Sequence, residues 1–147
     1  AFDIALMLKS LHHVPLDTMA EALDEIARVV RGGGHFYVSE PVYAGPLNDV
    51  MRLFHDEGRV RAAAQAALDA AAQGGAWRQV AERRFATPVR FGSFDDFERR
   101  MMRPTFADHQ LDDALVARVR DAFAPHCDAG GSASFARPLH VRLLQRQ

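Results

Sequence analysis

The chain has 147 residues, of which 48% are hydrophobic and 25% are charged, a composition typical of a globular protein with one core. Its net charge of −1 gives no electrostatic reason to expect nucleic acid or an anionic membrane as a partner. The single cysteine, Cys127, excludes an internal disulfide and a multi-cysteine zinc site, and it fits a reducing, cytoplasmic setting. We therefore predict a single domain over residues 1–147 that acts on small molecules.

The chain begins with a pattern of strand, helix and strand. Residues 2–9 form an almost continuous apolar run, which predicts a strand covered on both faces in a parallel sheet. A helix is expected over residues 18–31, started by a capping box of Thr18 and Glu21 and ended by a run of three glycines. Residues 35–40 form the next strand. Together these elements predict a βαβ unit with parallel strands.

The remainder of the chain predicts inserted helices and two more strands. From residue 45 apolar residues recur at helical spacing, which indicates two helices. Residues 85–91 alternate in polarity, which indicates a strand. Pro88 places it at a sheet edge or at a bulge, because proline cannot donate a ladder hydrogen bond. Ser93 with Asp96 is expected to cap a short helix, and a longer helix and a last strand follow. The phenylalanines expected to pack in the core are Phe94, Phe97, Phe106 and Phe123.

Two segments near the start carry recognisable motifs. The first runs from Phe2 to Pro15 and contains the letters LHHVP; the second runs from Ala22 to Pro41 and contains VVRGGG and FYVSEP. Both segments resemble the class I methyltransferases, especially the group that acts on small molecules and is related to ubiquinone and menaquinone methyltransferases. The resemblance implies the fourth and fifth strands of that family over residues 1–41, and a sixth and seventh strand further on, with the last inserted antiparallel.

The fold class expected from this resemblance is α/β: the C-terminal part of a Rossmann-like methyltransferase sheet, with strands equivalent to the fourth to seventh and with flanking and inserted helices. Its predicted parts are a strand–helix–strand core at 1–41, inserted helices or a lid at 42–80, and C-terminal strands and helices at 81–147. The glycine run at 32–34 follows a helix, so it is not the family's cofactor loop. We therefore expect a fragment that is inactive alone and that forms a homodimer through its unpaired first strand.

The predicted ligand region lies after residues 9 and 40, because ligands bind at the carboxyl ends of the strands in open α/β sheets. The resemblance implies S-adenosylmethionine as the cofactor. His13 is the candidate catalytic base, and the equal alternative is that one of the two adjacent histidines only fills loop space. The predicted contacts of the cofactor's methionine part are Lys9, Ser10, Leu11 and His12.

The expected methyl acceptor is a small molecule held at the end of the fifth strand and by the lid segment. Glu40 could bind an acceptor amine or hydroxyl, or it could be satisfied by neighbouring backbone donors. No metal site is predicted at residues 55–57, because adjacent helical residues point about 100° apart. Cys127 is interpreted as a structural thiol. The predicted substrate contacts are Glu40, Pro41, Tyr43, Arg52 and His55.

Methyl transfer from a sulfonium mainly needs alignment of the reactants, and a base is needed only where the nucleophile must lose a proton. The function predicted is S-adenosylmethionine-dependent methylation of a small molecule. The alternative is a non-catalytic, methyltransferase-like module for interaction or dimerisation. A dehydrogenase is disfavoured because the chain contains no dinucleotide fingerprint.

Overall fold

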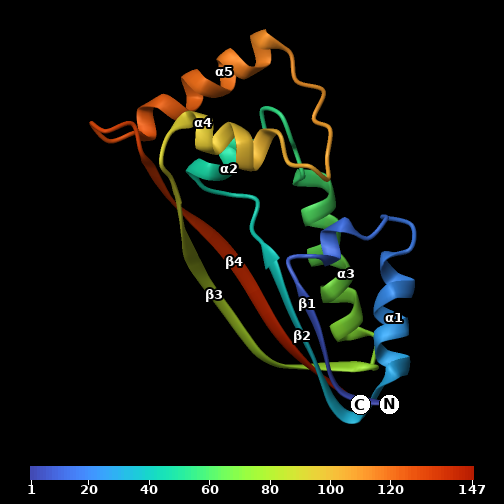
Figure 1. The fold of residues 1–147 in the computed structure, drawn as a ribbon. Coiled ribbons are helices and arrows are strands. Elements are labelled where there is room, and N and C mark those ends of the chain that lie inside the picture. Colours follow the sequence, from blue (N-terminus) through green and yellow to red (C-terminus); the bar gives the residue numbers. More distant parts are fainter. The chain divides into compact units, whose positions relative to one another are not determined.

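The computed structural model describes residues 1–147, which divide into two compact units. Unit 1 comprises residues 1–43, 58–85 and 138–147, and unit 2 comprises residues 44–57 and 86–137. That the two units form a single domain stays a prediction. The helices and strands, labelled in Figure 1, are β1 (Phe2–Leu8), α1 (Met19–Val29), β2 (Val30–Pro41), α2 (Pro46–Met51), α3 (Gly58–Gln73), β3 (Trp77–Phe91), α4 (Phe94–Phe97), α5 (Asp113–Phe123) and β4 (Ala133–Arg146).

The four strands form one sheet in the order β1-β2-β4-β3. β1 pairs with β2 in parallel, as the βαβ pattern predicted. β4 lies between β2 and β3 and runs antiparallel to β2, so the predicted antiparallel insertion of the last strand is confirmed. β3 is an edge strand, which is one of the two positions that Pro88 indicated. The predicted α/β fold is therefore confirmed, although β3 and β4 are longer than predicted.

β1 is covered on one face only. Ala5 and Met7 pack against the core of unit 1. α1 and α3 both pack on this side of β2 (Figure 1). The predicted burial of β1 on both faces is wrong, because no helix of unit 1 covers its other face. The side chains on that face are between 51% and 64% exposed: Phe2, Ile4, Leu6 and Leu8.

The junction between α1 and β2 also differs from the prediction. α1 ends at Val29, and the extended backbone of β2 begins at Val30, whose side chain is only 3% exposed. The glycines thus lie inside β2, where its register against β1 slips, and not at a helix end. Gly34 passes so close to β1 that an added Cβ would lie 2.8 Å from the carbonyl oxygen of Asp3. Gly33 has the left-handed φ of +76° that the glycine run predicted.

Helix capping matches the sequence prediction at one helix and not at another. The hydroxyl of Ser93 accepts a hydrogen bond from the backbone N–H of Asp96 at 3.1 Å, which confirms the cap of α4. The hydroxyl of Thr18 makes no cap and instead lies 3.3 Å from the carbonyl oxygen of Pro15. The predicted capping box is therefore wrong, because the turn before α1 already uses that hydroxyl.

Each unit has its own core. The core of unit 1 packs aliphatic residues of α1 and α3 against Phe36 and Trp77. The core of unit 2 is aromatic and contains Phe91, Phe94, Phe97, Phe123 and Phe135.

Three of the four phenylalanines expected in the core lie in unit 2's core, but Phe106 is 89% exposed, so its predicted packing is wrong. Cys127 is a half-buried free thiol, as expected. No helix in the chain has the length and apolar character needed to cross a membrane.

Candidate functional site

The loop that follows β1 begins with a strained residue. Lys9 has a φ of +57°, which residues with a side chain rarely adopt, and its N–H donates to the carbonyl of Ser39 at 2.7 Å. A single 3₁₀ turn, Leu11–His13, follows it. Such strain persists only where surrounding contacts over-determine the backbone, and it concentrates at ligand sites.

A buried carboxylate at the end of β2 holds this turn in place. Glu40 is 1% exposed, and its Oε1 accepts the N–H of Leu11 at 2.8 Å. Its Oε2 lies 2.5 Å from Nδ1 of His12, which is 5% exposed. The two strand ends predicted to form the ligand region are therefore joined by buried hydrogen bonds within unit 1. One oxygen of Glu40 accepts from a backbone donor, as expected if neighbouring backbone groups satisfy this carboxylate. Ligand binding by Glu40 stays a prediction.

The two adjacent histidines differ in their surroundings. The ring of His12 is buried against Glu40, whereas His13 is exposed, with its ring centroid 4.1 Å from that of His12. Lys9 is exposed and Ser10 is half-buried, so both can meet a ligand. Leu11 is fully buried and belongs to the core of unit 1. The side chains open to a ligand at this strand end are thus those of Lys9, Ser10 and His13.

Arg52 and His55, two predicted substrate contacts, belong to unit 2. Arg52 lies 3.7 Å from the carboxylate of Asp49, and Nε2 of His55 lies 2.9 Å from the carboxylate of Glu57. The helix expected across residues 55–57 is wrong, because α2 ends at Met51. A role of Arg52 and His55 in binding substrate stays a prediction.

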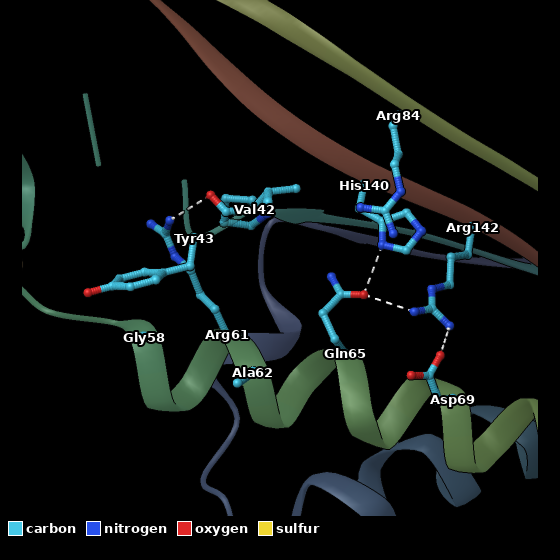
Figure 2. A pocket seen from close by; sticks show the side chains of 11 residues that line it. Val42, Tyr43, Gly58, Arg61, Ala62, Gln65, Asp69, Arg84, His140 and Arg142 are labelled. Carbon is cyan, nitrogen blue, oxygen red and sulfur yellow. Dashed lines mark hydrogen bonds and ion pairs between the residues drawn. The ribbon is translucent and has the colours of Figure 1, made fainter. Parts of the chain in front are cut away.

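Pro41 and Tyr43, the other two predicted substrate contacts, line a cavity of about 310 Å³ in unit 1 (Figure 2). α3 forms one side of this cavity, and β4 and β3 contribute charged side chains to it. Further residues that line it are Arg61, Gln65, Asp69, Arg84, His140 and Arg142.

A chain of hydrogen bonds crosses this cavity. Nε2 of His140 lies 2.5 Å from a carboxylate oxygen of Glu82, and its Nδ1 lies 2.9 Å from Oε1 of Gln65. Arg142 donates to that same oxygen of Gln65 at 2.9 Å and to the carboxylate of Asp69 at 2.6 Å. Four of these five side chains are joined by dashed lines in Figure 2. These hydrogen bonds join β4 to both α3 and β3.

Burial, a hydrogen bond and neighbouring charges shift the pKa values of His140 and Glu82 at this cavity. Burial lowers the pKa of His140, and the positive charges of Arg142 and Arg84 lower it further, against the hydrogen bond with Glu82. That hydrogen bond in turn lowers the pKa of Glu82. In unit 2, burial and the neighbouring His55 lower the pKa of His109.

His140 and Arg142 were not predicted from the sequence as site residues. A signal was present, because both residues alternate with the apolar Leu139, Val141 and Leu143 on the last strand. On a strand with one solvated face, such polar residues are expected on that face. Here α3 covers the face that carries them, so both are buried.

Comparison with known proteins gives a partial sequence match and a fold match. Residues 1–38 match the family described as methyltransferase domain. A candidate methyltransferase from Bacillus halodurans C-125 has a similar structure, with a TM-score of 0.58 and 14% sequence identity over 98% of this chain. The YcgJ protein from Bacillus subtilis has a TM-score of 0.56 and 19% identity over 100% of this chain. No curated protein sequence matches the chain.

The chain spans 64% and 65% of the length of these two proteins. At such low identity the two structures show the fold alone. Together with the match of residues 1–38 they confirm the predicted resemblance to the class I methyltransferases. The closer resemblance to ubiquinone and menaquinone methyltransferases stays a prediction.

Proposed function

We propose that this chain, which has the fold of the class I methyltransferases and matches a methyltransferase domain over residues 1–38, takes part in methyl transfer from S-adenosylmethionine to a small molecule. The observation that carries the proposal is this match, because it covers β1, its loop and most of β2. We place the protein in the cytoplasm, where the lone Cys127 would stay reduced.

The residues at the end of β1 suit the methionine part of the cofactor. S-adenosylmethionine would supply a methyl group on a cationic sulfur. The exposed ammonium of Lys9 and the hydroxyl of Ser10 offer donors of the kind that bind a carboxylate. In this proposal Leu11 and His12 support the loop from its buried side, since both side chains are buried.

His13 is the proposed catalytic base, because it is exposed beside the strand ends whereas His12 is buried against Glu40. It would accept a proton where the acceptor atom must lose one, a contribution of about 10²- to 10⁴-fold in rate. Glu40 is a positioning residue that fixes the turn carrying His13. The proposed contacts of the acceptor are Pro41, Tyr43, Arg52 and His55, and Glu40 would act on it only through the turn.

Calorimetric titration with S-adenosylmethionine and S-adenosylhomocysteine tests the proposal. It uses both this chain and the product of the complete reading frame. We expect the complete product to bind both compounds and this chain to bind them weakly or not at all, because the chain contains no Gly-rich loop between a strand and a helix. Absence of binding by the complete product would contradict the proposal.

The substitution Glu40→Gln tests the role of the buried carboxylate. It keeps an acceptor for the N–H of Leu11 but removes the charge beside His12. In the product of the complete reading frame we expect the affinity for S-adenosylmethionine to fall, while circular dichroism shows that the protein stays folded. The matched control is Glu25→Gln on α1, whose carboxylate pairs with Arg28 at the surface and which should leave binding unchanged. Equal affinity of the Glu40→Gln variant and the wild type for the cofactor would show that Glu40 has no role in binding it.

A second candidate function is a dimerisation module, favoured by the exposed edge and apolar face of β1. β1 is an outer strand of the sheet, and Ile4 and Leu6 are more than half exposed. Such an edge is a template for pairing with a second strand. We propose a homodimer through β1. Light scattering over a range of concentrations should show a dimer that Ile4→Lys dissociates, and a monomer at every concentration would contradict it.

A further inference from the structure

Cationic side chains outnumber carboxylates among the residues that line the cavity of α3, β3 and β4. Among its lining side chains are three guanidinium groups, Arg61, Arg84 and Arg142, and a single carboxylate, Asp69. Asp69 is already paired with Arg142 at 2.6 Å. The side chain of Arg84 is 65% exposed, and it makes a long ion pair of 3.9 Å with Glu82. The charge of Arg84 is therefore only weakly balanced.

The side-chain amide of Gln65 presents its N–H donors to this cavity. Its Oε1 accepts from both Arg142 and His140, and this fixes which end of the amide is oxygen, since a guanidinium can only donate. The amide nitrogen of Gln65 makes no hydrogen bond within the protein. The oxygen points toward β4 in Figure 2, with the nitrogen on the opposite side.

Arg142 has unused donors although it is buried. The residue is 7% exposed, and of the five N–H donors that a guanidinium carries, hydrogen bonds to Asp69 and Gln65 use two. Its Nε is buried without any partner. A buried donor that lacks an acceptor is costly, which is why such groups are rare in folded proteins.

We propose that this cavity binds the oxyanion group of a small organic acid, a carboxylate or a phosphate. Arg84, His140 and Arg142 lie together at one end of the cavity, whereas Arg61 lies near Val42 and Tyr43 at the other (Figure 2). Val42, Tyr43 and Ala62 supply apolar surface there. The ligand is therefore an acid with an apolar body, bound within unit 1. All residues that line the cavity belong to unit 1, and binding of the acid does not require methyl transfer.

Binding of the acid couples to protonation of His140. Nδ1 of His140 faces an oxygen of Gln65 that also accepts from Arg142, and Nε2 faces the carboxylate of Glu82. The neutral ring can donate to only one of these two acceptors, whereas the protonated ring donates to both. The charged groups around His140 are Asp69 on α3, Glu82 and Arg84 on β3, Arg142 on β4 and, opposite it on β2, Glu40. An added anion favours the charged ring, so the acid binds more tightly as the pH falls.

Calorimetry with benzoate and phenyl phosphate tests the proposal, with the neutral benzamide and benzyl alcohol as matched compounds. We expect at least one acid to bind and both neutral compounds to bind about tenfold more weakly or not at all. Tighter binding of benzoate identifies a carboxylate site, and tighter binding of phenyl phosphate identifies a phosphate site. Equal binding of acids and neutral compounds, or no binding of either acid at millimolar concentration, would overturn the proposal.

Variants locate the site. Arg84→Gln should weaken binding of the acid about tenfold and leave the fold intact, because the side chain is largely exposed. Arg142→Lys keeps the charge but loses the planar fork, and it should weaken binding similarly. The control is Arg83→Gln, the preceding residue of β3, whose side chain points to the opposite face of the strand. If Arg84→Gln and Arg83→Gln bind the acid equally well, the acid is not held in this cavity.

Discussion

The two units bury opposite kinds of side chain. All five buried polar or charged residues of the chain lie in unit 1: His12, Ser39, Glu40, His140 and Arg142. The buried residues of unit 2 are apolar, and its core is built from phenylalanine rings. A buried charge costs free energy unless it is paired, whereas a buried ring is stabilising without a partner. Unit 2 is therefore built mainly for packing, and the buried groups capable of binding and chemistry lie in unit 1.

The buried polar groups of unit 1 also share a place in the sheet. Glu40 on β2 and His140 on β4 are direct cross-strand partners. On one side Glu40 holds the turn after β1, and on the other His140 contacts α3 and β3. Replacement of a buried ion pair by apolar residues is often neutral or stabilising, so such pairs are weak evidence for a purely structural role. This favours a functional reason for the buried polar residues on β2 and β4.

The largest expected effect is on the packing of unit 2. Phe123→Ala should lower the free energy of unfolding by about 3 to 5 kcal/mol, because Phe123 is 1% exposed and its ring packs against four other phenylalanines. Chemical denaturation measures the change. The matched control is Phe106→Ala, which should change stability by no more than about 0.5 kcal/mol, since Phe106 is 89% exposed. Similar losses of unfolding free energy in both variants would contradict the packing described for this core.

A somewhat smaller effect is expected at the polar site of unit 1. Glu40→Ala should lower the free energy of unfolding by about 3 kcal/mol, because it leaves a buried N–H and a buried histidine without their acceptor. Denaturant titration beside Glu25→Ala, which removes an exposed carboxylate, checks the prediction. A stability equal to that of the wild type would mean that the Glu40 contacts add nothing to folding.

Helix capping should have a smaller effect still. Ser93→Ala should cost about 1 kcal/mol, since it removes the acceptor for the N–H of Asp96. Thr18→Ala should cost much less, because Thr18 makes no cap hydrogen bond. Thermal unfolding of the two variants compares them directly. A larger loss for Thr18→Ala would show that the sequence motif, and not the observed geometry, describes the start of α1.

The smallest expected effect is the acid sensitivity contributed by His140. Burial lowers the pKa of His140 below the ordinary value of 6.5, so the unfolded chain takes up the proton first as the pH falls. Stability is therefore complete above about pH 6.5 and is lost as the pH falls toward the folded pKa. Unfolding measured from neutral to mildly acidic pH should show a shallower loss in His140→Gln. An unchanged slope would mean that other groups, such as His109, carry the whole effect.

Local patterns predicted most of the fold. The parallel βαβ unit, the inserted helices, the edge position of Pro88 and the cap at Ser93 all follow from periodicity and turn chemistry along the chain. The errors arose where a tertiary neighbour decided the outcome. Val30 is extended because its side chain is buried in the core of unit 1, and β1 is half exposed because no helix covers its second face.

The candidate site was predicted only in part. Glu40 and the turn at Leu11–His13 were expected near each other because both follow strand ends on the same edge of a parallel sheet. His140 and Arg142 were missed, because their partners on α3 are more than 70 residues away in the sequence and only the fold brings them together.

The most direct test of the central claim, that unit 1 carries the binding chemistry, is a two-dimensional NMR titration of the labelled product of the complete reading frame with S-adenosylhomocysteine. We expect amide shifts to gather at Lys9 to His13 and near Glu40, with the aromatic core of unit 2 unchanged. Shifts confined to unit 2, or none at millimolar ligand, would contradict it.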